Sequence, residues 1–331
     1  MPHQPSADLR DWSGRLNRLA AAGRPCFFLL DFELRQPRLW TLDQLPDAGV
    51  RFAFPGHPDP LRTAPRPGKL HGPGPDRQAY AAAYAAVQAG LRHGDSFLTN
   101  LTFPSPVDFA GTLTAAYEHA AATYRVLLPG RFACFSPESF VKVTAAGRIE
   151  TRPMKGTAPD TAAGRAALLG STKEIAEHAT IVDLMRNDLS QLAREVRVLE
   201  YRYLDSTEAG AAGLLQSSSR IGGQLPSDWR ERLGDWLLQL LPAGSVSGAP
   251  KPATLDLIRR AEGGPRGYYC GVAGYFDGAE LDSCVLIRFL ERRADGGFMF
   301  RSGGGITARS TEAEEYAELL AKIRLPLGKY V

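Results

Sequence analysis

Short strand-like runs, separated irregularly by longer amphipathic segments, constrain the fold of this chain most strongly. Residues 26–33 read CFFLLDFE, an apolar run of the length of a buried strand, and 38–42 follows as a second one. Similar runs predict strands at 96–103, 132–136, 139–145, 148–153, 267–277, 283–291 and 296–305. Amphipathic periodicity predicts long helices at 173–194, 228–241, 252–261 and 311–324. Because these segments do not alternate as in repeated βαβ units, the sequence predicts an α+β fold with large antiparallel sheets.

The segment 54–76 is rich in proline and glycine and is the only candidate linker in the sequence. A helix is expected to begin at Arg77 directly after it, with Asp76 as its N-cap. The 331 residues suffice for one large domain or two ordinary ones.

Composition and charge exclude several classes of protein. The formal net charge is +3 and the basic residues are scattered, unlike a nucleic-acid-binding arm or a membrane-binding basic helix. The first residues, MPHQPSADLRDW, lack the apolar core of a signal peptide, and no window approaches about 18 consecutive apolar residues. We therefore expect a cytoplasmic protein that does not span a membrane. The four cysteines lie far apart and form no CxxC pair, which predicts free buried thiols and argues against zinc or a disulfide framework.

Two of the predicted helices carry carboxylates at helical spacing. In helix 173–194, an apolar stripe predicts the buried face, and Glu174 and Glu177 flank it on the surface. The stripe consists of Ile175, Ala179, Val182, Met185, Leu189 and Leu192. In helix 311–324, Glu315, Glu318 and Lys322 share one face, opposite a stripe through Ala313, Leu320 and Ile323, and Thr311 with Glu314 forms a capping-box pattern. Two such helices suit a hard cation such as Mg²⁺, and the alternative is two ordinary solvated faces.

Three further segments invite a functional interpretation. Lys155 in RPMKGTAPD is either a solvated lysine at a strand end or a reactive amine held beside Gly156. The segment GSVSGAPK, 244–251, does not have the spacing of a phosphate-binding loop. Likewise SGGGI at 302–306 is not a GxGxxG fingerprint, although its backbone amides can bind a carboxylate.

Eight segments, taken together, resemble the chorismate-utilising enzyme family, which includes anthranilate, aminodeoxychorismate, isochorismate and salicylate synthases. They are GDSFLTNLT (94–102), SPESF (136–140), RPMKGT (152–157), KEIAEHATIVDLMRNDL (173–189), GSVSGAPK (244–251), RGYYCGVAGYFD (266–277), IR (287–288) and SGGGI with EEYAELLAK (302–322). The resemblance implies a single synthase domain over 1–331, in which antiparallel sheets form a sandwich core flanked by helices. It also implies a reduced N-terminal region, 1–80, and a catalytic core, 81–331.

One position of the resemblance discriminates between activities. Anthranilate synthases resemble PIAGT where this chain has PMKGT, and component I of aminodeoxychorismate synthase has PIKGT there, so Lys155 points to the latter. The resemblance then implies amination of chorismate at C4 in p-aminobenzoate and folate biosynthesis. Leu98 stands where isochorismate and salicylate synthases have a water-activating lysine and where aminodeoxychorismate enzymes often have glutamine. Arg309 and Ser247 are smaller departures, and an anthranilate synthase or a non-catalytic chorismate-binding protein are the alternatives.

The resemblance also implies a role for each matching residue. Lys155 would be the nucleophile that forms a covalent intermediate, and Glu138 the general acid, protonated through burial. Mg²⁺ would be held by Glu177 and Glu315, with Glu174 and Glu318 close by. Substrate-binding positions are Gly156, Thr157, Tyr269, Arg288, Gly304, Gly305 and Lys322, with Arg288 binding the enolpyruvyl carboxylate.

The nitrogen source is expected to be ammonia from a separate glutamine amidotransferase subunit of the PabA-like kind. A glutaminase of the triad type needs a cysteine on a tight strand-to-helix elbow, and no cysteine of this sequence lies in such a segment. The synthase motifs also run to within about ten residues of the end of the sequence, which leaves no room in it for a second domain.

Overall fold

A computed structural model describes residues 6–207 and 214–328 of the chain and shows two antiparallel sheets with helices around them. The first sheet, in strand order, contains β10 (Met154–Pro159), β12 (Leu214–Gln224), β9 (Arg148–Thr151), β8 (Ser139–Val143), β15 (Leu281–Val285), β14 (Val272–Phe276), β1 (Cys26–Leu30) and β2 (Arg38–Thr41), with β11 (Arg194–Thr207) also paired to β12. The second contains β13 (Gly248–Ala249), β5 (Leu98–Phe109), β17 (Phe298–Ile306), β16 (Phe289–Arg292), β7 (Phe132–Ser136), β6 (Tyr124–Leu128) and β3 (Arg51–Ala53), and β4 (Leu70–His71) pairs with β5. The predicted α+β class with large antiparallel sheets is confirmed.

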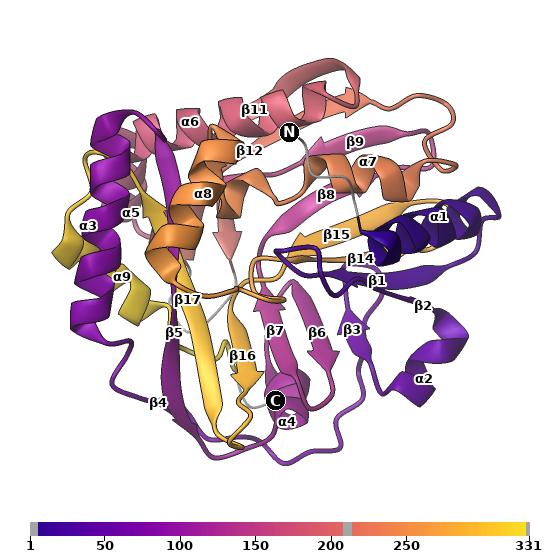
Figure 1. Ribbon diagram of the computed structural model, residues 1–331, viewed down its shortest axis with the longest axis horizontal. Helices are drawn as coiled ribbons and strands as arrows, with labels where there is room; N and C mark the ends of the chain where they lie inside the picture. Colours follow the sequence, from indigo (N-terminus) through magenta and orange to yellow (C-terminus); the bar gives the residue numbers. More distant parts are fainter. Residues whose placement is uncertain (1–5, 208–213, 329–331) are drawn as a thin grey trace.

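The helices cover the outer sides of these sheets. They are α1 (Ala7–Ala21), α2 (Leu45–Ala48), α3 (Arg77–His93), α4 (Leu113–His119), α5 (Ala162–Gly170), α6 (Thr172–Ser190), α7 (Leu233–Leu240), α8 (Lys251–Glu262) and α9 (Glu312–Ala321), with short 3₁₀ turns η1 (Leu42–Gln44) and η2 (Gly244–Val246). In Figure 1, α6 runs along the first sheet, where it contacts β10, β11 and β12, while α3, α8 and α9 gather beside β5 and β17. As predicted, α3 begins at Arg77 and Asp76 caps it by accepting a hydrogen bond from the backbone nitrogen of Ala79.

One hydrophobic core is shared by the two sheets. The rings of Phe27 on β1 and Phe52 on β3 stack with centroids 4.3 Å apart, although the two strands belong to different sheets. Phe132 on β7 also stacks on Phe289 of β16, within the second sheet. All four rings are buried. Burial of so much aromatic surface stabilises the arrangement in which the sheets meet along one seam.

Two of the chain's passages between the sheets lie at neighbouring points of this seam. The chain leaves β7 for β8 through Pro137 and Glu138, and it returns from β15 to β16 through residues 286–288. The two crossings are held together, because the carbonyl of Glu138 accepts from the amide of Val285 and that of Arg288 from the amide of Phe135. The single strand predicted over 283–291 is therefore wrong: Arg288, with a φ of 57°, breaks it into two strands of different sheets.

The buried faces of α6 and α9 differ from the predicted stripes. At the start of α6, Ile175 and Ala179 are exposed, whereas Glu177 and His178 are buried, so the expected surface position of Glu177 is wrong. On α9, Ala313 and Leu320 are exposed and Glu315 is buried together with Leu319. The capping box is also absent from α9, since the hydroxyl of Thr311 donates to the side chain of Glu314 and does not cap a backbone amide.

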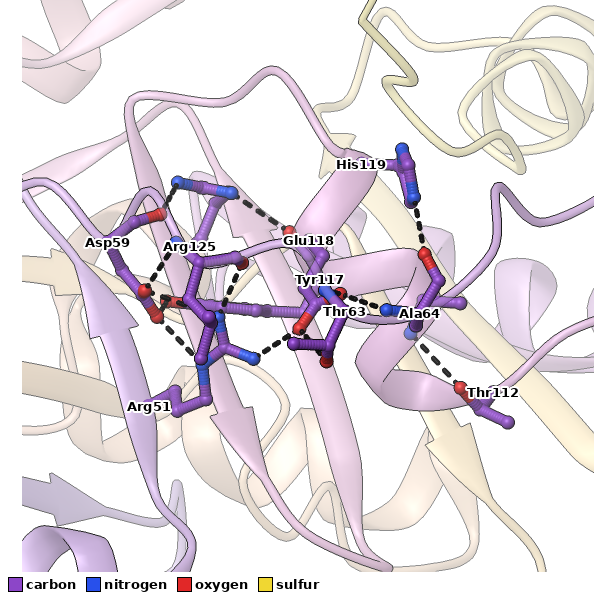
Figure 2. A network of polar contacts seen from close by, with 11 residues as sticks. Arg51, Asp59, Thr63, Ala64, Thr112, Tyr117, Glu118, His119 and Arg125 are labelled. Carbon is purple, nitrogen blue, oxygen red and sulfur yellow. Dashed lines mark hydrogen bonds and ion pairs between the residues drawn. The ribbon is translucent and has the colours of Figure 1, made fainter.

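The proline- and glycine-rich segment 54–76 is fixed to the second sheet by a polar network (Figure 2). Glu118 at the end of α4 has no exposed side-chain surface and accepts hydrogen bonds from the backbone nitrogens of Thr63 and Ala64, at 2.8 and 2.7 Å. Arg51 on β3 bridges Glu118 and Asp59, and Asp59 also accepts from the hydroxyl of Tyr117. These hydrogen bonds and ion pairs therefore hold the segment against the second sheet.

Candidate active site

A cavity of about 180 Å³ lies where the two sheets meet, and both chain crossings contribute to its wall. Most of the residues that the sequence singled out line it. They are Glu138, Lys155, Gly156, Tyr269, Arg288, Gly304, Gly305, Glu318 and Lys322. The side chain of Thr157, also predicted to bind substrate, lies outside the described part of the chain.

Lys155 reaches the cavity from a bulge in β10. The register against β12 shifts between Lys155 and Thr157, and Gly156 between them has a φ of 76°. A Cβ at Gly156 would lie 2.5 Å from Leu168 and 2.7 Å from a carboxylate oxygen of Glu174, so only glycine fits there. Gly305 on β17 has the matching role on the far side, because a Cβ there would lie 2.8 Å from Nζ of Lys155. Gly305 thus leaves room for the amine, and Gly156 permits the bulge from which Lys155 projects.

Close to this amine lie one carboxylate and one apolar side chain. Nζ of Lys155 is 3.4 Å from Oε2 of Glu177 on α6, and both side chains are largely shielded from solvent. Leu98 is buried, and its Cδ1 would be 3.0 Å from a Cβ at Gly305, so it packs against the same glycine as the amine. At the position where the resemblance implies a lysine or glutamine, this chain therefore has an apolar side chain packed beside Gly305.

Glu138 stands at the first crossing. Its Oε1 accepts a hydrogen bond of 2.5 Å from the hydroxyl of Ser245, which follows α7 in η2. Burial raises the pKa of Glu138 above its usual value, while the Ser245 hydrogen bond and the charges of Lys155 and Lys322 oppose that shift. A carboxyl whose pKa is raised keeps its proton more readily, as the predicted general acid requires.

Cationic groups line the rest of the cavity. The guanidinium of Arg288, at the second crossing, has no hydrogen-bond or ion-pair partner among the described residues, and burial together with nearby Arg324 lowers its pKa. Lys322 donates to the carbonyl oxygen of Gly303 at 2.7 Å and pairs with Glu318 at 2.6 Å. Tyr269 is buried beside them. An unpaired guanidinium with a nearby ammonium suits a small substrate that carries two carboxylates.

The four glutamates predicted to bind a metal lie around the same strands but do not form one cluster. Among the described residues, no group of three or more carboxylate, imidazole or thiol side chains is arranged to hold a metal ion. A Cβ at Gly304 would lie 3.4 Å from Oε2 of Glu315 and 3.7 Å from Oε1 of Glu318, while Glu174 and Glu177 approach from α6. Oε1 of Glu177 is buried and has no hydrogen-bond partner within the described ranges, which fits a missing cation.

Several residues of the site were not anticipated from the sequence. Ser245 lies in GSVSGAPK, so the motif itself was a sufficient signal for it. Asn100 and Arg301 lie in other predicted strands and line the cavity, and Arg301 pairs with Glu291 at 2.6 Å. Gln216 lines the cavity from β12, for which no strand was predicted.

The two sheets thus meet at a carboxyl, an amine and an unpaired guanidinium, a set of groups that suits a small anionic substrate. Residues 39–328 match the model of a family described as chorismate binding enzyme, and this chain belongs to that family. An uncharacterised PabA-like protein of Pasteurella multocida is 42% identical over 94% of this chain and 97% of its own length.

Two further proteins are similar to the chain, one in sequence and one in fold. Aminodeoxychorismate synthase component 1 of Klebsiella aerogenes is 32% identical over 75% of this chain, which spans 56% of that longer relative. In fold, the chain is similar to the crystal structure of anthranilate synthase component I from Streptococcus pneumoniae TIGR4, with a TM-score of 0.71 and 20% identity over 98% of this chain and 85% of the other. No described helix is long and apolar enough to cross a membrane.

Proposed function

We propose that the chain is a 4-amino-4-deoxychorismate synthase, which replaces the C4 hydroxyl of chorismate by an amino group. The observation that carries this proposal is the amine of Lys155, which Gly305 admits to the cavity that Glu138 also lines. The similarity to an aminodeoxychorismate synthase component supports the same activity. The activity would place the chain in p-aminobenzoate and folate biosynthesis.

In the first half of the reaction, the hydroxyl leaves and Lys155 is attached. The neutral amine of Lys155 attacks C2 with its lone pair, both conjugated ring double bonds shift by one position toward C4, and the C4–O bond breaks. Glu138 gives its proton to the departing oxygen, so that water leaves and Glu138 becomes a carboxylate. The raised pKa of Glu138 favours the protonated form that this step requires.

In the second half, ammonia attacks C4 with its lone pair. Both double bonds shift back, the bond between C2 and the nitrogen of Lys155 breaks, and its electron pair returns to the lysine as a neutral amine. The new ammonium group at C4 gives one proton to the carboxylate of Glu138, which restores the acid. The net change is chorismate and ammonia to aminodeoxychorismate and water.

The proposed substrate-binding groups come from separate segments of the chain. Arg288 is proposed to bind the enolpyruvyl carboxylate through two parallel N–H bonds, next to Tyr269 and Lys322. The backbone of Gly304 and Gly305 borders the same space without side chains in the way. We assign Mg²⁺ to Glu177 and Glu315, with Glu174 and Glu318 in support; when bound, it would neutralise the ring carboxylate.

The partner and location are also proposals. The name PabA-like, carried by a relative that matches almost the whole chain, supports a glutamine amidotransferase partner that supplies ammonia. The four cysteines are free and buried, as predicted, which supports a reducing compartment such as the cytoplasm.

The decisive experiment is turnover of chorismate by the purified chain with Mg²⁺ and ammonium chloride. Products are separated by chromatography with and without an added aminodeoxychorismate lyase. Aminodeoxychorismate, which gives p-aminobenzoate only when the lyase is present, is the expected result. Direct formation of anthranilate would identify an anthranilate synthase, and isochorismate would identify a hydrating enzyme; either product overturns the proposal.

A further inference from the structure

Two carboxamide side chains of the cavity lack hydrogen-bond donors. Oδ1 of Asn100 on β5 and Oε1 of Gln216 on β12 are buried, and neither has a partner among the described residues. Both residues line the cavity that contains Lys155. A buried acceptor without a donor destabilises a fold, so two of them in one small cavity point to a donor that enters it.

The strand register places Asn100 beside the amine of Lys155. Asn100 lies directly opposite Gly305 in the pairing of β5 with β17. Directly opposed residues of antiparallel strands project their side chains from the same face of the sheet. The side-chain direction at Gly305 points to Nζ of Lys155, at 2.8 Å from the position of a Cβ. The Asn100 side chain therefore projects from the face that the amine approaches.

Gln216 lines the same cavity from the other sheet. It pairs with Thr157, and the next residue of β12, Ser217, pairs with Lys155 itself. Two successive residues of one strand normally face opposite sides, but the bulge at Gly156 lets Lys155 and Gln216 line one cavity. The two carboxamides thus enter the cavity that contains Lys155 from separate sheets.

The chemistry of the reaction selects the donor. Chorismate carries two carboxylates, which accept hydrogen bonds and are matched by Arg288 and Lys322. Ammonia is the complementary reactant: its lone pair goes to carbon and its three N–H groups need acceptors. As the C4–N bond forms, the nitrogen becomes positive, and neutral carbonyl oxygens stabilise that charge without attracting a proton.

We propose that Asn100 and Gln216 form the site that binds ammonia and orients its lone pair for attack. This inference rests on the proposed function and deepens it, because it names the groups that bind the second substrate. Neither side chain takes part in bonding to chorismate or in formation of the Lys155 adduct. Their effect falls on the half of the reaction that consumes ammonia.

The test uses near-isosteric apolar variants, Gln216→Met and Asn100→Leu, in steady-state assays with ammonium chloride at fixed pH. Each is expected to raise the KM for ammonium about tenfold, the effect of a lost hydrogen bond to a nitrogen that becomes charged. The KM for chorismate stays near that of the unaltered protein. In the absence of ammonium, mass spectrometry shows the same adduct on Lys155. Gln216→Glu, which keeps an acceptor oxygen and adds negative charge, leaves the KM for ammonium equal or lower.

Ser218→Ala is the matched control. Ser218 is on the same strand and its hydroxyl is likewise buried without a partner, but it does not line the cavity, so its kinetics should not change. If the apolar variants raise the KM for chorismate and leave that for ammonium unchanged, the oxygens bind substrate and the inference is overturned. A variant that yields no soluble protein is replaced by Gln216→Glu, for which a tenfold rise in the KM for ammonium overturns the inference. Failure of the unaltered protein to aminate C4 would instead overturn the proposed function, so the two failures are distinguishable.

Discussion

Lys155 is the residue on which the covalent mechanism depends. Lys155→Ala removes the amine that the cavity admits beside Gly305, so aminodeoxychorismate formation should fall to the background rate. The fold should persist, because Lys155 is a cavity-lining residue and not part of the hydrophobic core. The measurements are turnover, the thermal midpoint and the mass of the peptide containing residue 155 after incubation with chorismate alone. Exposed Lys69, replaced by alanine, is the control. Normal turnover by folded Lys155→Ala protein would contradict a covalent role.

Ser245 sets the protonation of the proposed acid. Its hydrogen bond stabilises the carboxylate form of Glu138, so Ser245→Ala should raise the pKa of Glu138 further above its usual value. The acid works only when protonated, and activity is lost as pH rises through its pKa; the high-pH limb of kcat/KM should therefore move to higher pH. Profiles are measured at constant free ammonia. Ser247→Ala is the control, since Ser247 donates only to backbone carbonyls of the same segment. A limb that moves to lower pH would show that Ser245 does not act in this way.

The metal proposal separates Glu177 and Glu315 from Glu138. Glu177→Gln and Glu315→Gln each remove a charge from a hard-cation site, and the Kd for Mg²⁺, measured by calorimetry, should rise about tenfold or more. Glu138→Gln should cut turnover roughly 10²-fold with little change in that Kd. Glu312→Gln is the matched control on α9, because Glu312 pairs with Arg77 away from the cavity. Identical Mg²⁺ titrations of all the variants would show that the assignment of acid and ligands is wrong.

Positions in the cavity were predictable from the sequence only where a motif carried them. Glu138, Lys155 and Arg288 come together from distant segments, and the order of the motifs, not their local pattern, marked them. The burial of Glu177 was not predictable from periodicity, because the first turns of α6 face a polar cavity and not the apolar core. Prediction of a buried helix face from hydrophobic spacing assumes that this face is apolar. At a functional site the buried face carries polar side chains, so the prediction fails there.

At the scale of elements, the same cause explains the larger errors. The run 283–291 has the composition of one buried strand, but Arg288 at positive φ turns the chain from one sheet into the other. Strands β11 and β12 were not predicted because their sequences are rich in polar residues. In β12, for example, Gln216, Ser217 and Ser218 follow one another. Helix α3, in contrast, has an ordinary cap and an apolar face against α8 and β5, and its first residue was predicted correctly.

The loop network of Figure 2 allows a prediction about stability. Glu118→Gln removes a buried charge that Arg51 and two backbone amides of the loop share, and the free energy of unfolding should fall by about 3 kcal/mol. Although burial alone would raise the pKa of Glu118, these hydrogen bonds hold it below its usual value. Its contribution is therefore present above the pKa of an unfolded glutamate and is lost as pH falls through the lower folded value.

Denaturant unfolding at neutral and acidic pH measures both effects. The difference between Glu118→Gln and the unaltered protein should shrink at acidic pH, and proteolysis within 54–76 should be faster in the variant. Asp183→Asn is the control, because Asp183 makes an exposed pair with Arg186 on α6, worth at most about 1 kcal/mol. Equal stability of the variant and the unaltered protein would show that the network does not hold the loop.

At the scale of the whole molecule, the fold class followed from the sequence, but the position of the site did not. An irregular succession of strands and helices indicates antiparallel sheets, but it does not specify the order of the strands within each sheet. The site exists because two neighbouring crossings join the sheets, so that Glu138 and Arg288 meet strands β10 and β17 at one seam. Pairing between distant strands is decided by the shared core of the two sheets, which local patterns do not encode.

The source of nitrogen for the reaction is a prediction about the whole molecule, because it depends on all four of its cysteines. All four cysteines are buried, and burial raises the pKa of each thiol, to about 12 for Cys26 and Cys270, so none is a ready nucleophile for glutamine. The purified chain should therefore aminate chorismate with ammonium salts, faster at higher pH where free ammonia increases, and should not use glutamine. Addition of a cognate glutaminase subunit should confer use of glutamine at neutral pH. Rates are compared with each nitrogen source, with and without that subunit. Comparable rates from glutamine and ammonium by the isolated chain would show that the two-component interpretation is wrong.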